Sequence, residues 1–149
     1  MKLSTKGRYG LKAMLDLAVQ SSEGQVVLKS IAERQGISEN YLEQLFAVLK
    51  KHKLVKSIRG SQGGYTLGES PDKITVGDIL RALEGSMAPV DCVAENHASE
   101  CDRYDCCVTK GIWLRIRDSI NAVIDSTTLQ DLVDDYKRTA GKDDSMYFI

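Results

Sequence analysis

The segment over 28–51, LKSIAERQGISENYLEQLFAVLKK, constrains the fold more than any other part of this chain. Apolar residues recur at helical spacing on both sides of a short Gly-Ile-Ser sequence, which predicts helices over 28–35 and 39–51 joined by a tight turn. Gly36 suits the end of the first helix, and Ser38 suits the N-cap of the second. This is the helix-turn-helix pattern, although any tight helical hairpin can share it.

A glycine-rich hairpin is predicted directly after these helices. The sequence LVKSIRGSQGGYTLG alternates like a strand over 54–58, turns through three glycines and returns over 65–67. A hairpin in this position is typical of a wing, with Arg59 at its tip. The GSQGG turn lacks the Gly-Lys-Ser/Thr ending of a phosphate-binding loop, which argues against a nucleotide site.

The remaining elements predict a mainly α chain with a small β-hairpin wing. Helical spacing predicts helices over 6–19 and 109–126, a helix opened by Thr75 and a short helix that begins near Thr128. The helix over 109–126 is about 27 Å long and has isoleucines along one side. It is a candidate for helix-to-helix dimerisation, with a core helix as the plain alternative.

Charge is divided unevenly along the chain. The net charge is −1, but residues 1–60 carry eleven Lys/Arg and five Asp/Glu, whereas residues 61–149 carry nine and sixteen. A basic first part on an acidic remainder favours a polyanionic partner such as nucleic acid. A solvated surface of uneven charge is the alternative.

The helix over 39–51 has an apolar and a polar side. The predicted inward side is Tyr41, Leu42, Leu45, Val48 and Leu49, and the predicted outward side is Asn40, Glu43, Gln44, Ala47, Lys50 and Lys51. Side-chain amides can pair with adenine, and a carboxylate can accept a hydrogen bond from cytosine. An arginine at the wing tip suits the minor groove, and lysines suit phosphates. The candidate DNA-binding residues are Asn40, Tyr41, Glu43, Gln44, Arg59, Lys6 and Lys56.

All four cysteines lie within sixteen residues, 92–107, in a segment without helical or strand periodicity. The chain has no apolar run of the 18 residues needed to span a bilayer, and its N-terminus lacks a secretory apolar core. We therefore expect a cytoplasmic protein, where clustered cysteines more often indicate metal binding or redox chemistry than structural disulfides.

Three segments, MKLSTKGRYGLKAMLDLA, IAERQGISENYLEQLF and LVKSIRGSQGGYTLG, closely resemble the winged-helix transcription regulators that include the iron–sulfur regulator IscR, the nitric-oxide sensor NsrR and the cysteine-metabolism repressor CymR. The resemblance implies a homodimer that is joined by the long C-terminal helix and binds a double-stranded DNA operator. We accordingly divide the chain into a winged helix-turn-helix DNA-binding domain over 1–85, a cysteine-rich cluster-binding loop over 86–110, and a dimerisation helix with a C-terminal tail over 111–149.

The resemblance also implies a purpose for the cysteines. Cluster-binding members carry three cysteines in this loop, and CVTKGIW resembles the end of their motif. Cys92, Cys101 and Cys107 then correspond to the three metal ligands, across a loop that is three residues longer than usual. Cys106 is extra.

Two departures from the family pattern leave the fourth ligand open. The histidine of IscR-like members is here Lys110, whose ammonium group cannot ligate iron. The carboxylate that NsrR-like members bring from the partner subunit is here Arg8. His97, Cys106 or a loop carboxylate are the remaining candidates.

Together these features predict a dimeric DNA-binding regulator, not an enzyme, that senses iron–sulfur status through a [2Fe–2S] cluster and controls cluster-biogenesis genes. A [4Fe–4S] cluster is the alternative, as in an NsrR-like nitric-oxide sensor, and zinc is the rival metal. A cluster-free CymR-like regulator of cysteine metabolism is the rival function. A thiol redox enzyme using Cys106 or Cys107 would leave the basic segment and the wing without a purpose.

Overall fold

The computed structural model of the chain describes residues 3–95 and 101–140. Its helices are α1 (Thr5–Gln20), α2 (Leu28–Gln35), α3 (Glu39–Lys51), α4 (Val76–Glu84), α5 (Lys110–Ser126) and α6 (Leu129–Ala140), its strands are β1 (Val55–Ile58) and β2 (Gly64–Leu67), and single 3-10 turns lie at Ser21–Glu23, Pro71–Lys73, Asp91–Val93 and Tyr104–Cys106. The prediction of a mainly α chain with one small hairpin is confirmed. No helix in the described part of the chain is long and apolar enough to cross a membrane.

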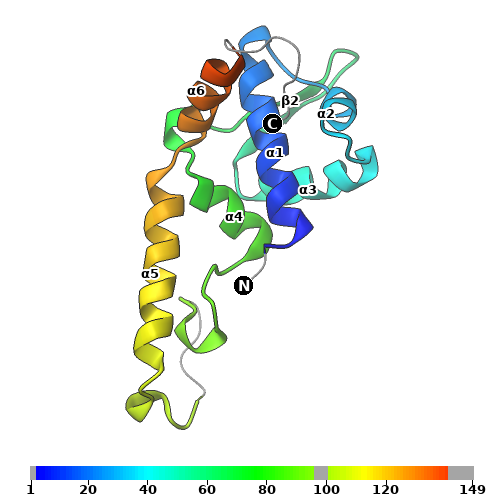
Figure 1. Cartoon of the computed structure of the whole chain (residues 1–149). Helices are drawn as coiled ribbons and strands as arrows, with labels where there is room; N and C mark the ends of the chain where they lie inside the picture. The colour runs from blue at the N-terminus through cyan, green and yellow to red at the C-terminus, as the bar shows by residue number, and fades with distance from the viewer. Residues whose placement is uncertain (1–2, 96–100, 141–149) are drawn as a thin grey trace.

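α1 runs through the centre of the molecule, with α2 and α3 on one side of it and α4 and α6 packed against it (Figure 1). The largest fully buried side chains on these helices are Phe46, Met14, Leu17, Ile31, Leu42, Leu49, Ile79 and Leu129. Removing this apolar surface from water is the main stabilising contribution to the fold. The rings of Phe46 and Tyr65 meet edge to face with centroids 4.9 Å apart, which attaches the wing to α3.

The helix ends follow the predicted local chemistry. Gly36 ends α2 in the left-handed conformation, with φ of 65°. Ser38 caps α3 by accepting a hydrogen bond from the backbone N–H of Tyr41 at 3.2 Å. Thr75 and Asp78 form a reciprocal capping box at the start of α4. These caps set where each helix begins and ends, so the turn between α2 and α3 has the geometry of a helix-turn-helix.

The wing is an antiparallel pair of β1 and β2 in which Val55 lies opposite Leu67 and Ile58 opposite Gly64. Val26 pairs with Tyr65 on the other side of β2, through backbone hydrogen bonds of 2.9 and 2.8 Å. A Cβ atom at Gly64 would lie 2.6 Å from the backbone oxygen of Val26, so only glycine permits this close approach.

One prediction about α3 needs correction. Leu42, Leu45 and Leu49 are buried as predicted, but Val48 is 36% exposed, and Phe46, which was not assigned to the inward side, is fully buried. Because each residue turns the helix by about 100°, the buried stripe runs through 42, 45, 46 and 49, and position 48 falls at its edge.

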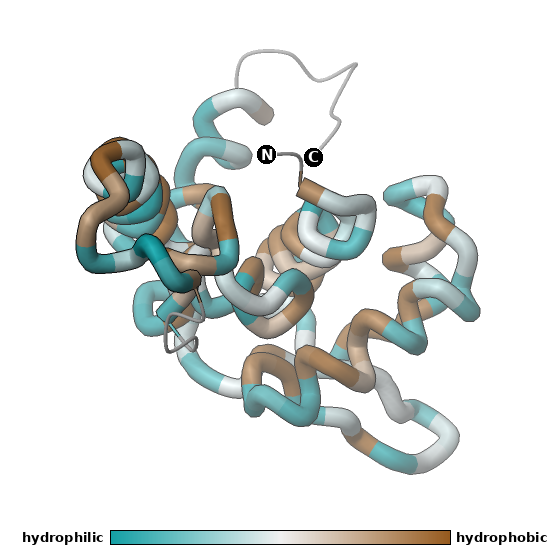
Figure 2. Tube along the Cα trace, turned by 90° about the horizontal axis from the view of Figure 1, so that it is seen from below, coloured by the Kyte–Doolittle hydropathy of each residue, from teal (hydrophilic) through white to brown (hydrophobic). Residues whose placement is uncertain are grey.

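α5 departs from the pattern of the other long helices. Its N-terminal end projects away from the body of the molecule, the helix runs back toward the body, and α6 continues from it and packs against α1 (Figure 1). Among the residues of α5, all of which are described, Ile124 alone is buried, whereas Ile112 is 43% and Val123 65% exposed. Seen from below, α5 lies at the edge of the molecule and carries both hydrophobic and hydrophilic residues (Figure 2).

Candidate DNA interface and cysteine loop

The residues predicted on the outward side of α3, which are polar apart from Ala47, are all exposed. Asn40, Glu43 and Gln44 occupy the first two turns, and Ala47, Lys50 and Lys51 follow them toward the wing. Arg59 is exposed at the start of the hairpin turn, and Lys56 is exposed on β1. We call the exposed side of α3 together with the hairpin the α3–wing surface.

Tyr41 is half-buried and joins the α3–wing surface to the start of α1. Its hydroxyl lies 3.2 Å from the hydroxyl of Thr5, and its ring meets the ring of Tyr9 edge to face at 6.2 Å. Lys6 is exposed in the first turn of α1, beside Thr5. The start of α1 therefore lies next to the start of α3, a contact between residues 36 positions apart that no local sequence pattern indicates.

One further contact holds the hairpin of the α3–wing surface in place. The amide of Gln25 donates to the backbone oxygen of Gln62 at 2.6 Å and so ties the hairpin turn to the segment before α2. Lys50, Lys53 and Lys56 line one surface depression at the base of the wing together with Glu69, so its charged lining is positive on balance.

An ion pair between buried Asp16 and partly exposed Arg34 fixes α2 against α1. Asp16 has no exposed surface, and its carboxylate accepts two hydrogen bonds from Arg34 Nε and one from Arg34 Nη2, at 2.6–3.1 Å. Gln35 donates a further hydrogen bond at 2.9 Å. The carboxylate raises the pKa of Arg34 mainly through this hydrogen bonding, so the guanidinium stays charged. Asp16 thereby holds the helix that precedes α3 in a single position.

The cysteine loop begins in a packed segment and ends in an exposed one. Cys92 is half-buried in the turn Asp91–Val93, and the next two residues, Val93 and Ala94, are 2% and 9% exposed. Cys101 and Cys106 are exposed, and Cys107 is half-buried just before α5. In the described part of the chain, which includes all four cysteines, no disulfide forms.

Cys107 has the most distinctive surroundings of the four. Its Sγ lies 3.2 Å from the hydroxyl of Thr109, and the hydroxyl, the backbone N–H of Lys110 and the positive charge of Lys110 lower the pKa of the thiol. The Lys110 ammonium lies 3.9 Å from the centroid of the Tyr104 ring. A lowered pKa favours the thiolate, which is the form that ligates metals.

The side-chain types in the loop favour metal binding, whereas their positions in this structure do not. Four thiols in one loop suit an iron–sulfur cluster, because thiolates are the usual cluster ligands. However, no three His, Cys, Asp or Glu side chains in residues 3–95 and 101–140 are grouped so that they could hold a metal ion. His97, a candidate fourth ligand, lies outside the described residues.

Comparisons with known proteins agree with this architecture. The Rrf2 family, described as iron-dependent transcriptional regulators, matches residues 3–135. The chain is 50% identical over 132 residues to the transcriptional regulator CymR of Bacillus subtilis, covering 89% of each protein, and 44% identical over 133 residues to IscR of Pectobacterium carotovorum, covering 89% of this chain and 79% of that protein.

Solved structures show the same fold. The structure of CymR, titled the global cysteine regulator of B. subtilis, superposes with a TM-score of 0.74 over 90% of this chain and 97% of that one. The structure of IscR from T. potens also gives a TM-score of 0.74, at 48% identity, over 100% of this chain and 94% of that one.

Proposed function

The chain belongs to the Rrf2 family of winged-helix transcriptional regulators, and we propose that it is a cytoplasmic homodimer that binds operator DNA and senses iron–sulfur status through a [2Fe–2S] cluster. Its targets on this proposal are genes of cluster biogenesis. Residues 1–85 form the DNA-binding domain, 86–110 the sensing loop, and 111–149 the dimerisation helix with the C-terminal tail.

DNA binding is assigned to the α3–wing surface. Asn40, Glu43 and Gln44 are exposed at the start of α3 and offer amide and carboxylate groups to base edges in the major groove. Arg59 at the wing reaches toward the minor groove, and Lys6 and Lys56 contact phosphates. Tyr41 positions the start of α1, and with it Lys6, through its contact with Thr5.

Dimerisation is assigned to α5. A helix whose isoleucines and valine remain partly exposed in one chain can bury them against a second copy. The twofold symmetry of such a dimer matches a pseudo-palindromic operator, with half-sites separated by about 34 Å or a multiple of the helical turn.

The observation that carries the sensing role is the confinement of all four cysteines to the segment that links the winged helix to α5. Cys92, Cys101 and Cys107 would hold the cluster, with the fourth ligand to come from His97, Cys106 or a carboxylate. When bound, the cluster supplies a redox-active, oxidant-sensitive group to the loop. Since the three thiols are not grouped in this structure, binding requires the exposed part of the loop to move toward Cys92, which is anchored.

A second function rests on a separate observation. The 50% identity to CymR and the ungrouped thiols favour a cluster-free regulator of cysteine metabolism. An NsrR-like sensor with a [4Fe–4S] cluster is a variant of the first proposal.

Anaerobic purification separates these functions. We expect iron, sulfide and a visible charge-transfer spectrum in the wild-type protein, lost in Cys92→Ala, Cys101→Ala and Cys107→Ala and retained in Cys106→Ala. The iron and sulfide content per chain distinguishes the two cluster types. A wild-type protein without iron or colour after anaerobic reconstitution would favour the CymR-like function.

A further inference from the structure

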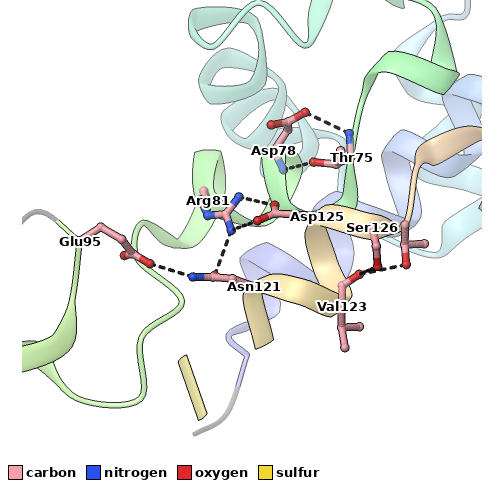
Figure 3. A network of polar contacts seen from close by, with 9 residues as sticks. Thr75, Asp78, Arg81, Glu95, Asn121, Val123, Asp125 and Ser126 are labelled. Carbon is pink, nitrogen blue, oxygen red and sulfur yellow. Dashed lines mark hydrogen bonds and ion pairs between the residues drawn. The ribbon is translucent and has the colours of Figure 1, made fainter. Parts of the chain in front are cut away.

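A series of polar contacts joins the start of the cysteine loop to α5 and α4 (Figure 3). Glu95 accepts a hydrogen bond from the amide nitrogen of Asn121 at 3.1 Å, and the amide oxygen of Asn121 accepts one from Arg81 at 2.9 Å. Arg81 also donates two hydrogen bonds to Asp125, at 2.6 and 2.8 Å. Asn121 is therefore bonded to the loop through its N–H group and to α4 through its oxygen.

Further hydrogen bonds hold Glu95 and Val93, which lie at the loop end of this series of contacts. Ser86 donates to Glu95 at 2.7 Å, and Arg117 on α5 donates to the backbone oxygen of Val93 at 3.1 Å. The Ser86 hydroxyl, a backbone N–H and the Asn121 amide lower the pKa of Glu95 to about 2, with a smaller contribution from Arg117. Glu95 is thus a carboxylate at neutral pH, and it lies between Cys92 and Cys101 in the sequence.

The other end continues toward the α3–wing surface. α4 and α5 approach so closely that a Cβ atom at Gly77 would lie 2.1 Å from Asp125 Oδ1. Glu84, at the end of α4, accepts hydrogen bonds from the backbone N–H of Gly7 at 2.8 Å and from the hydroxyl of Ser4. The start of α1 in turn contacts Tyr41 of α3 through Thr5. A displacement of α4 therefore reaches the residues that support α3.

We propose that Asn121 couples the cysteine loop to the α3–wing surface. The inference rests on the proposed role of the loop as the sensing element. A group carried by the loop thiols, either a cluster that joins Cys92 to the exposed cysteines or a substituent on the half-buried Cys92, acts on the segment from Cys92 to Glu95. Asn121 passes that change to Arg81 and α4. A carboxamide suits this position because it donates to a carboxylate on one side and accepts from a guanidinium on the other. A coupling of this kind requires that these contacts differ between the two states of the loop. The two states then differ in their affinity for DNA.

The test uses Asn121→Asp in the full-length protein. Aspartate has the shape of asparagine and still accepts from Arg81, but it repels Glu95, so the substitution cuts the loop side of the connection and leaves the α4 side. Ser119→Asp adds the same charge at an exposed position of the same helix and is the matched control. Glu95→Ala cuts the connection from the loop side without touching the contact between α4 and α5.

The quantity measured is the ratio of the dissociation constants of modified and unmodified protein for a duplex that the wild type selects from a random library. In one arm the cysteines are alkylated with iodoacetamide, and in the other the protein is reconstituted with iron and sulfide. We expect a ratio that differs from one by about fivefold or more in the wild type and in Ser119→Asp. In Asn121→Asp and in Glu95→Ala we expect the ratio to return to one.

The two proposals fail in different ways. If Asn121 is merely structural, Asn121→Asp weakens both forms of the protein by the same factor and keeps the wild-type ratio, which overturns the coupling. A wild-type ratio of one in the alkylation arm also overturns it. Absence of iron uptake by the wild type overturns the cluster proposal instead, while the alkylation arm still decides the role of Asn121.

Discussion

α3 and α5 are both amphipathic helices, but they differ in how much of their apolar side they bury within the chain. α3 buries Leu42, Leu45, Phe46 and Leu49 within its own chain, whereas α5 buries Ile124 and leaves Ile112 and Val123 substantially exposed. The winged helix is complete in one chain, and its polar side is free to contact a partner. In the described part of the chain α5 leaves apolar side chains exposed and the loop thiols are not grouped, and we propose that a second copy and a cluster complete them.

The winged helix depends on the ion pair between Asp16 and Arg34, so Arg34→Leu should have the largest effect on stability. The substitution leaves the buried Asp16 carboxylate with Gln35 as its remaining hydrogen-bond donor among the residues described, which should lower the free energy of unfolding by about 3–5 kcal/mol. Urea denaturation at a fixed protein concentration measures this. Arg59→Leu, at the exposed wing, is the matched control and should change stability by no more than about 0.5 kcal/mol. Equal stability of the two variants would contradict the role of the ion pair.

Ile116→Glu tests whether the apolar side of α5 forms the dimer interface. Ile116 is half-buried on the apolar side of α5, and a charge there should weaken the dimer by about 2 kcal/mol or more, since the carboxylate would be buried against apolar groups of the second copy. Sedimentation equilibrium gives the dimer dissociation constant, and far-ultraviolet circular dichroism should show that the helices remain. Ser119→Glu, on the exposed side of the same helix, should leave the dimer unchanged. An unaltered dimer in Ile116→Glu would remove α5 from the interface.

Arg59→Ala tests whether the wing contacts DNA. As a groove contact Arg59 should contribute about 1–3 kcal/mol to operator binding, which fluorescence anisotropy on a specific duplex can measure. Lys137→Ala, which removes an exposed positive charge from α6, is the control and should bind almost as the wild type does. Wild-type affinity in Arg59→Ala would exclude the wing from the DNA interface.

Thr109→Val should have the smallest effect and concerns the chemistry of the cysteine loop. The Thr109 hydroxyl is the main cause of the lowered pKa of Cys107, so its loss should raise that pKa and shift the pH profile of alkylation at Cys107 toward higher pH. Peptide mapping by mass spectrometry after short iodoacetamide pulses gives the rate at each pH. Thr139→Val removes a threonine hydroxyl that bonds the backbone of α6 and should leave the profile unchanged. A profile identical to wild type in Thr109→Val would mean that the hydroxyl does not stabilise the thiolate.

Much of the helix-turn-helix was predictable because its signals are local. A glycine that ends α2, a serine that caps α3 and a threonine that opens α4 each act within one helical turn, so neighbouring residues suffice to locate them. The exposed positions of Asn40, Glu43 and Gln44 followed from the same periodicity. The inward side was less well predicted, because the choice between Phe46 and Val48 depends on where the neighbouring helix and the wing lie.

The element order, the caps and turns, the charge division and the gathering of every cysteine in one loop could all be predicted from the sequence. These properties depend on residue identity and short-range spacing alone. The packing of the helices, in contrast, determines that Asp16 is buried against Arg34, that Tyr41 reaches Thr5, that Asn121 links Glu95 to Arg81, and that α5 leaves Ile112 and Val123 exposed. Residues in these contacts are separated by 18 to 40 positions, and their meeting depends on how whole helices pack, which local sequence does not encode.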